Sequence, residues 1–180
     1  NFPIHLTDIA RAQLTARAQF VAAPEATLIR AALKEPLDSA AAYQLARYAP
    51  SYNALLRTTC VPTMLSGGHA ENALPAIATA TINCRISPVE EVATIRSALR
   101  AAIADTGVQI TEVFPAKPSP PSPLLPERIA LDRGAIRSTW GRDIPISPVQ
   151  ENGATDGLYF RNAGIPVYGI QGIAMPVGEE

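Results

Sequence analysis

Two β-type segments joined by a glycine-rich connection constrain this 180-residue chain more than any other feature. Residues 56–65 are rich in β-branched side chains, and in residues 77–86 small or apolar side chains alternate with polar ones. Alternation with a period of two is typical of a strand with one apolar and one polar face. The sequence therefore predicts two antiparallel strands whose long connection, residues 66–75, carries polar groups.

The two cysteines occupy equivalent positions in this hairpin. Cys60 and Cys84 each lie 12 residues from residue 72, so a hairpin symmetric about that residue places them opposite each other. A cross-strand disulfide could then form in an oxidising compartment, but disulfide geometry is restrictive. We expect two buried free thiols, with the disulfide as the alternative. The compartment, cytoplasm or periplasm, stays open.

Helical periodicity dominates the sequence before the hairpin. Amphipathic helices are expected from about residue 8, over 26–33 and over 39–48, and the frequent alanines favour them. Pro24 and Pro36 are expected to separate these helices, because proline interrupts a helix interior.

After the hairpin the sequence changes character twice. Pro88 opens an expected helix over 89–104, and residues 108–114 alternate as a third strand. Residues 115–126 are rich in proline and predict an extended spacer between two domains. The remaining expected elements are a helix over 127–140, a strand over 144–149, a helix over 158–162 and a strand over 165–170. Their order is that of an α/β layer.

Composition excludes several classes of function. The chain has 15 basic and 16 acidic residues, a net charge of −1, and no block of like charge, so we expect no nucleic-acid partner. No apolar run is long enough to cross a membrane, so no membrane partner is expected either. Two histidines and two cysteines are few for a zinc site, so we expect no metal in this chain.

Polar residues of the hairpin connection are candidates for ligand contact. His69, Glu71 and Asn72 could touch a ligand that approaches the neighbouring glycines. The alternative, which the loop alone favours, is that its glycine and asparagine residues only satisfy turn geometry. His69 and Glu71 have the spacing of zinc deaminases, but the cysteine pair that those enzymes require is absent.

A second group of candidates lies at the end of the hairpin and in a later loop. Arg85 is either a solvated surface arginine or a bidentate clamp for a carboxylate. The loop with Gly153, Thr155 and Asp156 follows an expected strand and precedes a short helix. Thr155 or Asp156 could simply cap that helix, but we favour an anion site built from the same loop.

These motifs together resemble one family. Residues 67–75, Gly-Gly-His-Ala-Glu-Asn-Ala-Leu-Pro, followed by Arg85 and Pro88, are similar to the G-G-x-x-x-N-x-[IL]-P … R-x-x-P signature of family twenty of the metallopeptidases. This is the group of aminoacylases, glutamate carboxypeptidases and succinyl-diaminopimelate desuccinylases. Residues 153–157 and 164–166 resemble the same family's substrate loop and following strand. The resemblance covers about residues 50–170.

The resemblance implies a fold and a reaction. It implies an α+β fold in which residues 1–114 form most of a lid and dimerisation domain, a ferredoxin-like antiparallel sheet with helices that is incomplete at its N-terminus. Residues 115–126 would be the linker, and residues 127–180 part of the α/β catalytic domain. The reaction would be hydrolysis of a peptide or N-acyl amino acid amide bond in an enzyme that holds two zinc ions.

The resemblance also implies roles for individual residues. Asn72 would hydrogen-bond the substrate, reaching across a homodimer to the partner's site, with His69 and Glu71 as possible neighbours. Arg85 would bind the substrate's carboxylate. The pocket for that carboxylate would be lined by Gly153, Thr155 and Asp156.

The family's metal-binding motifs do not occur in this chain. Its H-x-D motif and Glu-Glu pair would precede the lid, and its last metal-binding histidine would follow Ile170, where residues 174–180 contain none. We therefore expect a fragment that recognises substrate and dimerises but is inactive alone. The alternative is a non-catalytic dimerisation module that reuses the lid fold.

Overall fold

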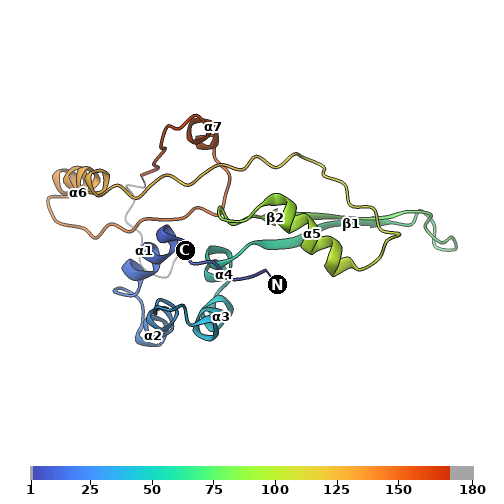
Figure 1. Ribbon diagram of the computed structural model, residues 1–180, viewed down its shortest axis with the longest axis horizontal. Coiled ribbons are helices and arrows are strands. Elements are labelled where there is room, and N and C mark those ends of the chain that lie inside the picture. Colours follow the sequence, from blue (N-terminus) through green and yellow to red (C-terminus); the bar gives the residue numbers. More distant parts are fainter. Residues whose placement is uncertain (1, 171–180) are drawn as a thin grey trace.

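In the computed structural model, which describes residues 2–170, a bundle of short helices carries a long two-stranded β-ribbon (Figure 1). The arrangement confirms the expected α+β class. The helices are α1 (Asp8–Arg17), α2 (Ala23–Ala32), α3 (Ser39–Tyr48), α4 (Pro50–Leu56), α5 (Val92–Ile103), α6 (Pro126–Trp140) and α7 (Gly157–Asn162), and the strands are β1 (Thr59–Gly67) and β2 (Ala78–Arg85).

Side-chain caps and prolines set where the first helices begin. The Thr7 hydroxyl accepts a hydrogen bond from the Ala10 amide at the start of α1, and the Asp38 carboxylate accepts one at the start of α3. Pro24 lies in the first turn of α2 and therefore begins that helix. It had been expected to lie between two helices. Helix α4 was not predicted, and it replaces the first part of the strand expected from residue 56.

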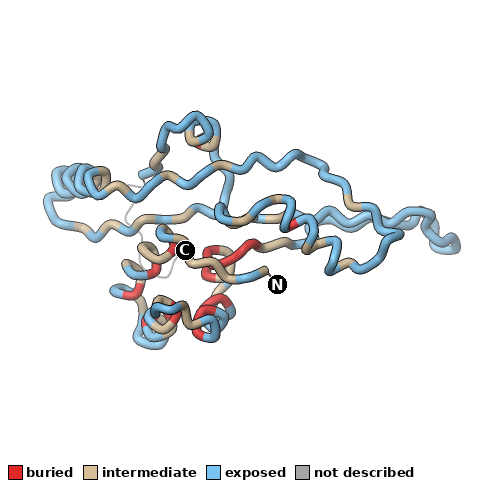
Figure 2. Tube along the Cα trace, in the orientation of Figure 1, coloured by how far each residue is buried: buried red, intermediate tan, exposed pale blue. Residues whose placement is uncertain are grey.

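The core of the molecule lies among α1, α2, α3 and α4 (Figure 2). Leu14, Ile29, Leu45 and Leu56 are fully buried there, one from each helix. Burial of each such side chain stabilises the fold by about 1.5–3 kcal/mol. This bundle is the part of the described chain that packs like an ordinary domain interior.

A buried polar network closes one side of the bundle. Arg17 Nε donates to the Tyr52 hydroxyl at 2.6 Å and lies 3.2 Å from the Glu25 carboxylate. The Tyr52 hydroxyl in turn donates to Glu25. Burial, and then the hydrogen bond to Glu25, raise the pKa of Tyr52 well above its ordinary value, so this phenol stays protonated in the folded protein.

The β-ribbon has the predicted register. Cys60 lies opposite Cys84 and Thr59 opposite Arg85, with a bulge between Pro62 and Met64. The expectation of buried free thiols was wrong, because the cysteines are half-buried and joined by a disulfide. The two cysteines lie directly opposite each other, with Cα atoms 4.1 Å apart, so their sulfur atoms can reach each other and form the bond. Closing this loop of 24 residues contributes about 3 kcal/mol in the chain-entropy model.

Three expected strands are absent from the described part of the chain. Residues 108–114, 144–149 and 165–170 pair with no strand, so the sheet has two strands and the expected α/β layer does not form. Their backbones lie beside other elements. Gln150, which follows the second segment, accepts a hydrogen bond from the Thr7 hydroxyl through its side-chain oxygen, and its backbone amide donates to the Gln13 side-chain oxygen at 2.9 Å.

The proline-rich segment is extended, as predicted, and is bound to the C-terminal part of the described chain. Ser122 donates to the Val167 carbonyl at 2.7 Å and accepts from the Val167 amide at 2.9 Å. Arg161 of α7 donates to the Ser119 hydroxyl. These contacts hold α7 beside the segment (Figure 1).

Leu45→Ala tests the position of the core. We expect the free energy of unfolding to fall by about 2–5 kcal/mol, because the substitution leaves a cavity in the bundle. Leu131→Ala is the matched control: Leu131 is 68% exposed on α6, and its replacement should change stability by less than about 0.5 kcal/mol. Urea unfolding followed by circular dichroism measures both, and equal effects would contradict the assignment of the core.

Tyr52→Phe tests the buried network through pH. A tyrosine whose pKa is raised in the folded state stabilises the protein below the unfolded pKa of about 10, and this contribution is lost as pH rises above that value. We expect wild-type stability to fall more between about pH 8 and about pH 11 than that of Tyr52→Phe. Identical pH dependence of the two proteins in urea unfolding would refute the network's role.

Candidate carboxylate-binding site

Two of the predicted site elements meet at the base of the ribbon. Arg85 Nη1 donates to the carbonyl oxygen of Asn152 at 3.0 Å, although the two residues are 67 positions apart. A Cβ atom added to Gly153 would lie 4.0 Å from the same nitrogen. The structure therefore places the end of β2 against the loop of residues 151–157.

The guanidinium of Arg85 keeps most of its hydrogen-bonding capacity. An arginine has five N–H donors, and Asn152 is the one partner of Arg85 among residues 2–170. Within the same residues no carboxylate lies within 4.0 Å of it. The side chain is exposed, so a carboxylate from solution can reach the group.

The loop itself is shaped by a close approach at Gly157. A Cβ atom at this position would lie 2.8 Å from Arg161 Nη1 and 3.1 Å from both Thr155 Oγ1 and Val167 Cγ1. Asp156 occupies the N-cap position of α7, but its side chain makes no capping hydrogen bond. The Asp156 side chain therefore does not cap α7, and both Thr155 and Asp156 are exposed.

The other predicted site residues lie at the opposite end of the ribbon. His69, Glu71 and Asn72 are exposed in the connection between β1 and β2. The length of β2 alone separates this tip from Arg85 by about 23 Å, at roughly 3.3 Å per residue. Within one chain, then, the structure does not bring Asn72 to the carboxylate-binding candidates (Figure 1).

The buried side chain of Thr58, which was not predicted as a structural contact, fixes the base of the ribbon through hydrogen bonds. The Thr58 hydroxyl accepts a hydrogen bond from the Ser87 amide at 2.8 Å and donates to Glu90. Glu90 lies 3.4 Å from His5 Nε2. Thr58 is 1% exposed, and because residues 56–65 were expected to form one strand, no feature of the sequence marked this position.

The neighbouring Arg57 is buried on the other side of the chain. Its guanidinium lies 4.8 Å from the centre of the Tyr43 ring and donates to the Phe2 carbonyl. Arg57 thus binds the start of β1 to α3 of the helical bundle, and Thr58 binds it to the residues that follow β2.

The described residues do not fit a metal centre. Within residues 2–170 no three side chains among His, Cys, Asp and Glu come together. His5 faces Glu90 at the base of the ribbon, whereas His69 lies at its tip. Residues 174–180, considered above for a metal-binding histidine, lie outside the described part.

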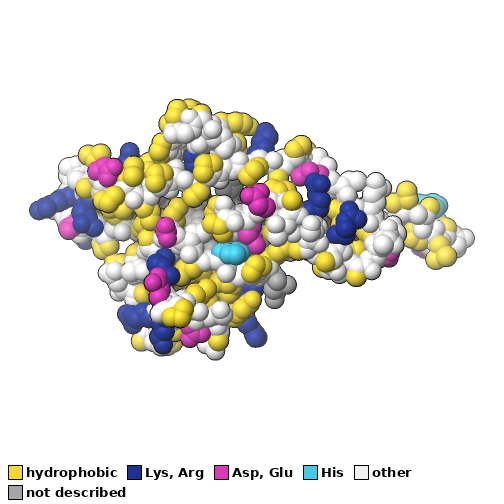
Figure 3. Space-filling model, in the orientation of Figure 1, with side chains coloured by type: hydrophobic (Ala, Val, Ile, Leu, Met, Phe, Trp, Pro, Cys, Tyr) yellow, Lys and Arg dark blue, Asp and Glu magenta, His cyan; other side chains and the backbone are white. Residues whose placement is uncertain are grey.

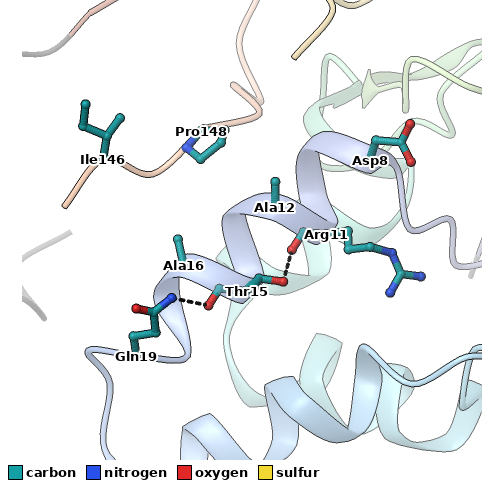
Figure 4. Close-up of a pocket in the computed structure, with 8 residues that line it drawn as sticks. All are labelled: Asp8, Arg11, Ala12, Thr15, Ala16, Gln19, Ile146 and Pro148. Carbon is teal, nitrogen blue, oxygen red and sulfur yellow. Dashed lines mark hydrogen bonds between the residues drawn. The ribbon is translucent and has the colours of Figure 1, made fainter. Parts of the chain in front are cut away.

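A shallow groove of about 450 Å³ lies between α1 and residues 146–148 (Figure 4). Ala12 and Ala16 face Ile146 and Pro148 across it. Thr15 and Gln19 of its helical wall donate to carbonyls of α1 itself, Thr15 to Arg11 at 2.8 Å, whereas Arg11 donates to the Leu33 carbonyl outside the helix. The groove has no contact with the Arg85 loop and offers few free polar groups.

Comparison with known proteins assigns this chain to a family. The model of the peptidase dimerisation domain of M20 peptidases matches residues 12–111, more than half of the chain. The chain belongs to the M20 metallopeptidase family. The M20 dimerisation domain thus includes the helical bundle, the ribbon and both Asn72 and Arg85, whereas the loop of residues 151–157 follows the matched region. This match confirms the family resemblance found in the sequence.

Several curated relatives share one name, N-fatty-acyl-amino acid synthase/hydrolase PM20D1. The human protein is 31% identical over 121 residues, which are 66% of this chain and 24% of the relative. The mouse protein is 40% identical over 74 residues, 41% of this chain and 15% of the relative. The Xenopus tropicalis protein is 30% identical over 123 residues, 66% and 23% respectively.

The chain spans about a quarter of the length of these relatives or less. No solved structure matches it significantly. Among the described residues, no helix is long and apolar enough to cross a membrane.

Arg85→Ala tests the contact between β2 and the loop. We expect the backbone order parameters of residues 151–157 to fall, because the loop loses its hydrogen bond to the ribbon. Arg96→Ala is the control, since it removes an exposed ion pair with Glu112 and leaves the loop untouched. NMR relaxation of isotope-labelled protein measures both variants, and unchanged order parameters of the loop in Arg85→Ala would show that the contact does not hold it.

Proposed function

We propose that this chain is the substrate-recognition and dimerisation part of an M20 hydrolase acting on peptide or N-acyl amino acid bonds. The observation that carries the proposal is the exposed Arg85 guanidinium, held against the loop of residues 151–157 with most of its donors free. Its planar fork matches the geometry of a carboxylate.

The chemistry of the relatives supports a substrate with one free carboxylate. Their name specifies N-fatty-acyl amino acids, which carry such a group. In this proposal Arg85 binds the carboxylate, Gly153 leaves room for it, and the Thr155 hydroxyl adds a donor. Asp156 would repel a carboxylate at close range, so we place it at the rim of the pocket, where it discriminates against further negative charge.

Asn72 fits the proposal only through a second copy. Because the ribbon separates it from Arg85 in its own chain, we propose that it hydrogen-bonds substrate at the partner's site in a homodimer, with His69 and Glu71 beside it. The ribbon has the surface that such an interface needs. Its exposed apolar side chains are Val61, Met64, Leu65, Leu74, Ile77 and Ile82.

The chemical step is assigned to the whole enzyme. The two zinc ions that the family resemblance implies have no fitting ligand set among residues 2–170. We therefore propose that this chain binds the substrate's carboxylate but does not hydrolyse the amide bond by itself.

Binding of N-acetylphenylalanine and of its primary amide tests the role of Arg85. We expect wild-type protein to bind the acid at least about tenfold more tightly than the amide, which corresponds to 1.4 kcal/mol for a charge-assisted contact. Arg85→Gln should remove this difference, whereas Arg96→Gln should keep it. Isothermal titration calorimetry measures all three proteins, and retained discrimination in Arg85→Gln would overturn the assignment.

Leu65→Asp tests the dimer surface. Leu65 is 79% exposed on the ribbon, and a carboxylate there should shift the protein toward monomer, because the interface would have to bury an unpaired charge. Leu131→Asp makes the same change at an exposed position of α6, beyond the matched domain, and should leave the oligomeric state unchanged. Sedimentation equilibrium that finds both variants equally dimeric would exclude the ribbon as the interface.

A further inference from the structure

The β-ribbon has almost no packing of its own. Every residue from 61 to 83 is exposed, and β1 and β2 form the whole sheet among the described residues (Figure 2). An isolated two-stranded ribbon is at best marginally stable in water, because it buries too little apolar surface. Its order therefore depends on how its two strands are joined at the base.

One covalent bond joins the strands there. Cys60 and Cys84 form the pair next to the first pair of the ribbon, Thr59 and Arg85. Both cysteines are half-buried and adjoin the exposed residues Val61 and Asn83, so a dissolved dithiol can reach the sulfur atoms. Beyond this bond the strands are held by their ladder of backbone hydrogen bonds and by contacts of exposed side chains such as Ser66 with Thr79.

The disulfide also positions Arg85. Arg85 directly follows Cys84, and its guanidinium reaches the Asn152 carbonyl from the strand end that the disulfide holds. The Thr58 hydroxyl, at the start of β1, accepts the amide of Ser87, two residues beyond Arg85. Arg85 therefore lies between two links to β1, a disulfide at Cys84 and a hydrogen bond at Ser87, and the disulfide is the covalent one.

We propose that the Cys60–Cys84 disulfide is a redox switch that sets whether Arg85 is held at the loop of residues 151–157. In the oxidised chain the ribbon base is closed and Arg85 is in place. In the reduced chain the hydrogen bonds of Thr58 are the side-chain links that remain at the base, the strands separate beyond them and Arg85 leaves the loop. The consequence for carboxylate binding rests on the proposed function, whereas the opening of the ribbon does not.

The redox step is an ordinary thiol–disulfide exchange with a dithiol. One thiolate of the dithiol attacks a sulfur of the disulfide and forms a mixed disulfide, releasing the other cysteine as a thiolate. The second thiolate of the reagent then attacks the mixed disulfide. Two electrons pass to the protein, which gains two protons as its two thiols form, and the dithiol is oxidised to its own disulfide.

Hydrogen exchange on the 180-residue chain, oxidised and after treatment with dithiothreitol, tests the switch. We expect amides of residues 78–85 to exchange at least about tenfold faster after reduction. The helices α1, α2 and α3 contain no cysteine and should keep their protection, which shows that the chain has not unfolded as a whole. Equal protection of residues 78–85 in both states would overturn the proposal.

The double variant Cys60→Ser/Cys84→Ser gives a permanently open form. We expect it to match the reduced wild type in exchange and to be unaffected by dithiothreitol; a change on adding dithiothreitol would overturn the assignment to this bond. N-acetylphenylalanine binding separates the two proposals. Equal binding by oxidised and reduced chains overturns the switch, whereas no binding by either, together with faster exchange on reduction, supports the switch and refutes the proposed function.

Discussion

The placement of the ribbon depends on the hydrogen bonds of the Thr58 hydroxyl group. It is buried where α4 gives way to β1, accepts the Ser87 amide and donates to Glu90, and Glu90 faces His5. One small side chain thereby connects the N-terminal segment, the start of the ribbon and the residues that lead into α5. Because the group is satisfied in both directions, the two strands leave the bundle side by side.

Because the ribbon is anchored at one end, the bundle and the ribbon of the described chain have different properties. The helical bundle supplies the buried apolar core. The ribbon carries exposed side chains from residue 61 to residue 83, and Figure 3 shows it projecting beyond the rest of the molecule. The base of the ribbon is held in place and carries Arg85, whereas the tip with Asn72 projects away from the bundle (Figure 1). In the function proposed above, Arg85 at the base serves its own subunit and Asn72 at the tip serves another subunit.

Local pattern was sufficient for the elements that depend on their own residues. The limits of α3 and the register of Cys60 opposite Cys84 followed from periodicity and hairpin symmetry. The strands expected over 108–114, 144–149 and 165–170 failed because alternation describes the faces of a strand and not the presence of a neighbouring edge. The contact of Arg85 with Asn152 joins residues far apart in sequence, so the pattern indicated each partner but not their meeting.

We propose that Arg85 and the loop of residues 151–157 form one carboxylate-binding site. Titration of isotope-labelled protein with N-acetylphenylalanine, followed by amide chemical shifts in NMR spectra, is the decisive test of this site. We expect shift changes concentrated at Arg85 and at residues 152–157, and none with the primary amide of the same compound. Changes concentrated instead along the groove of α1, or equal changes with acid and amide, would contradict it.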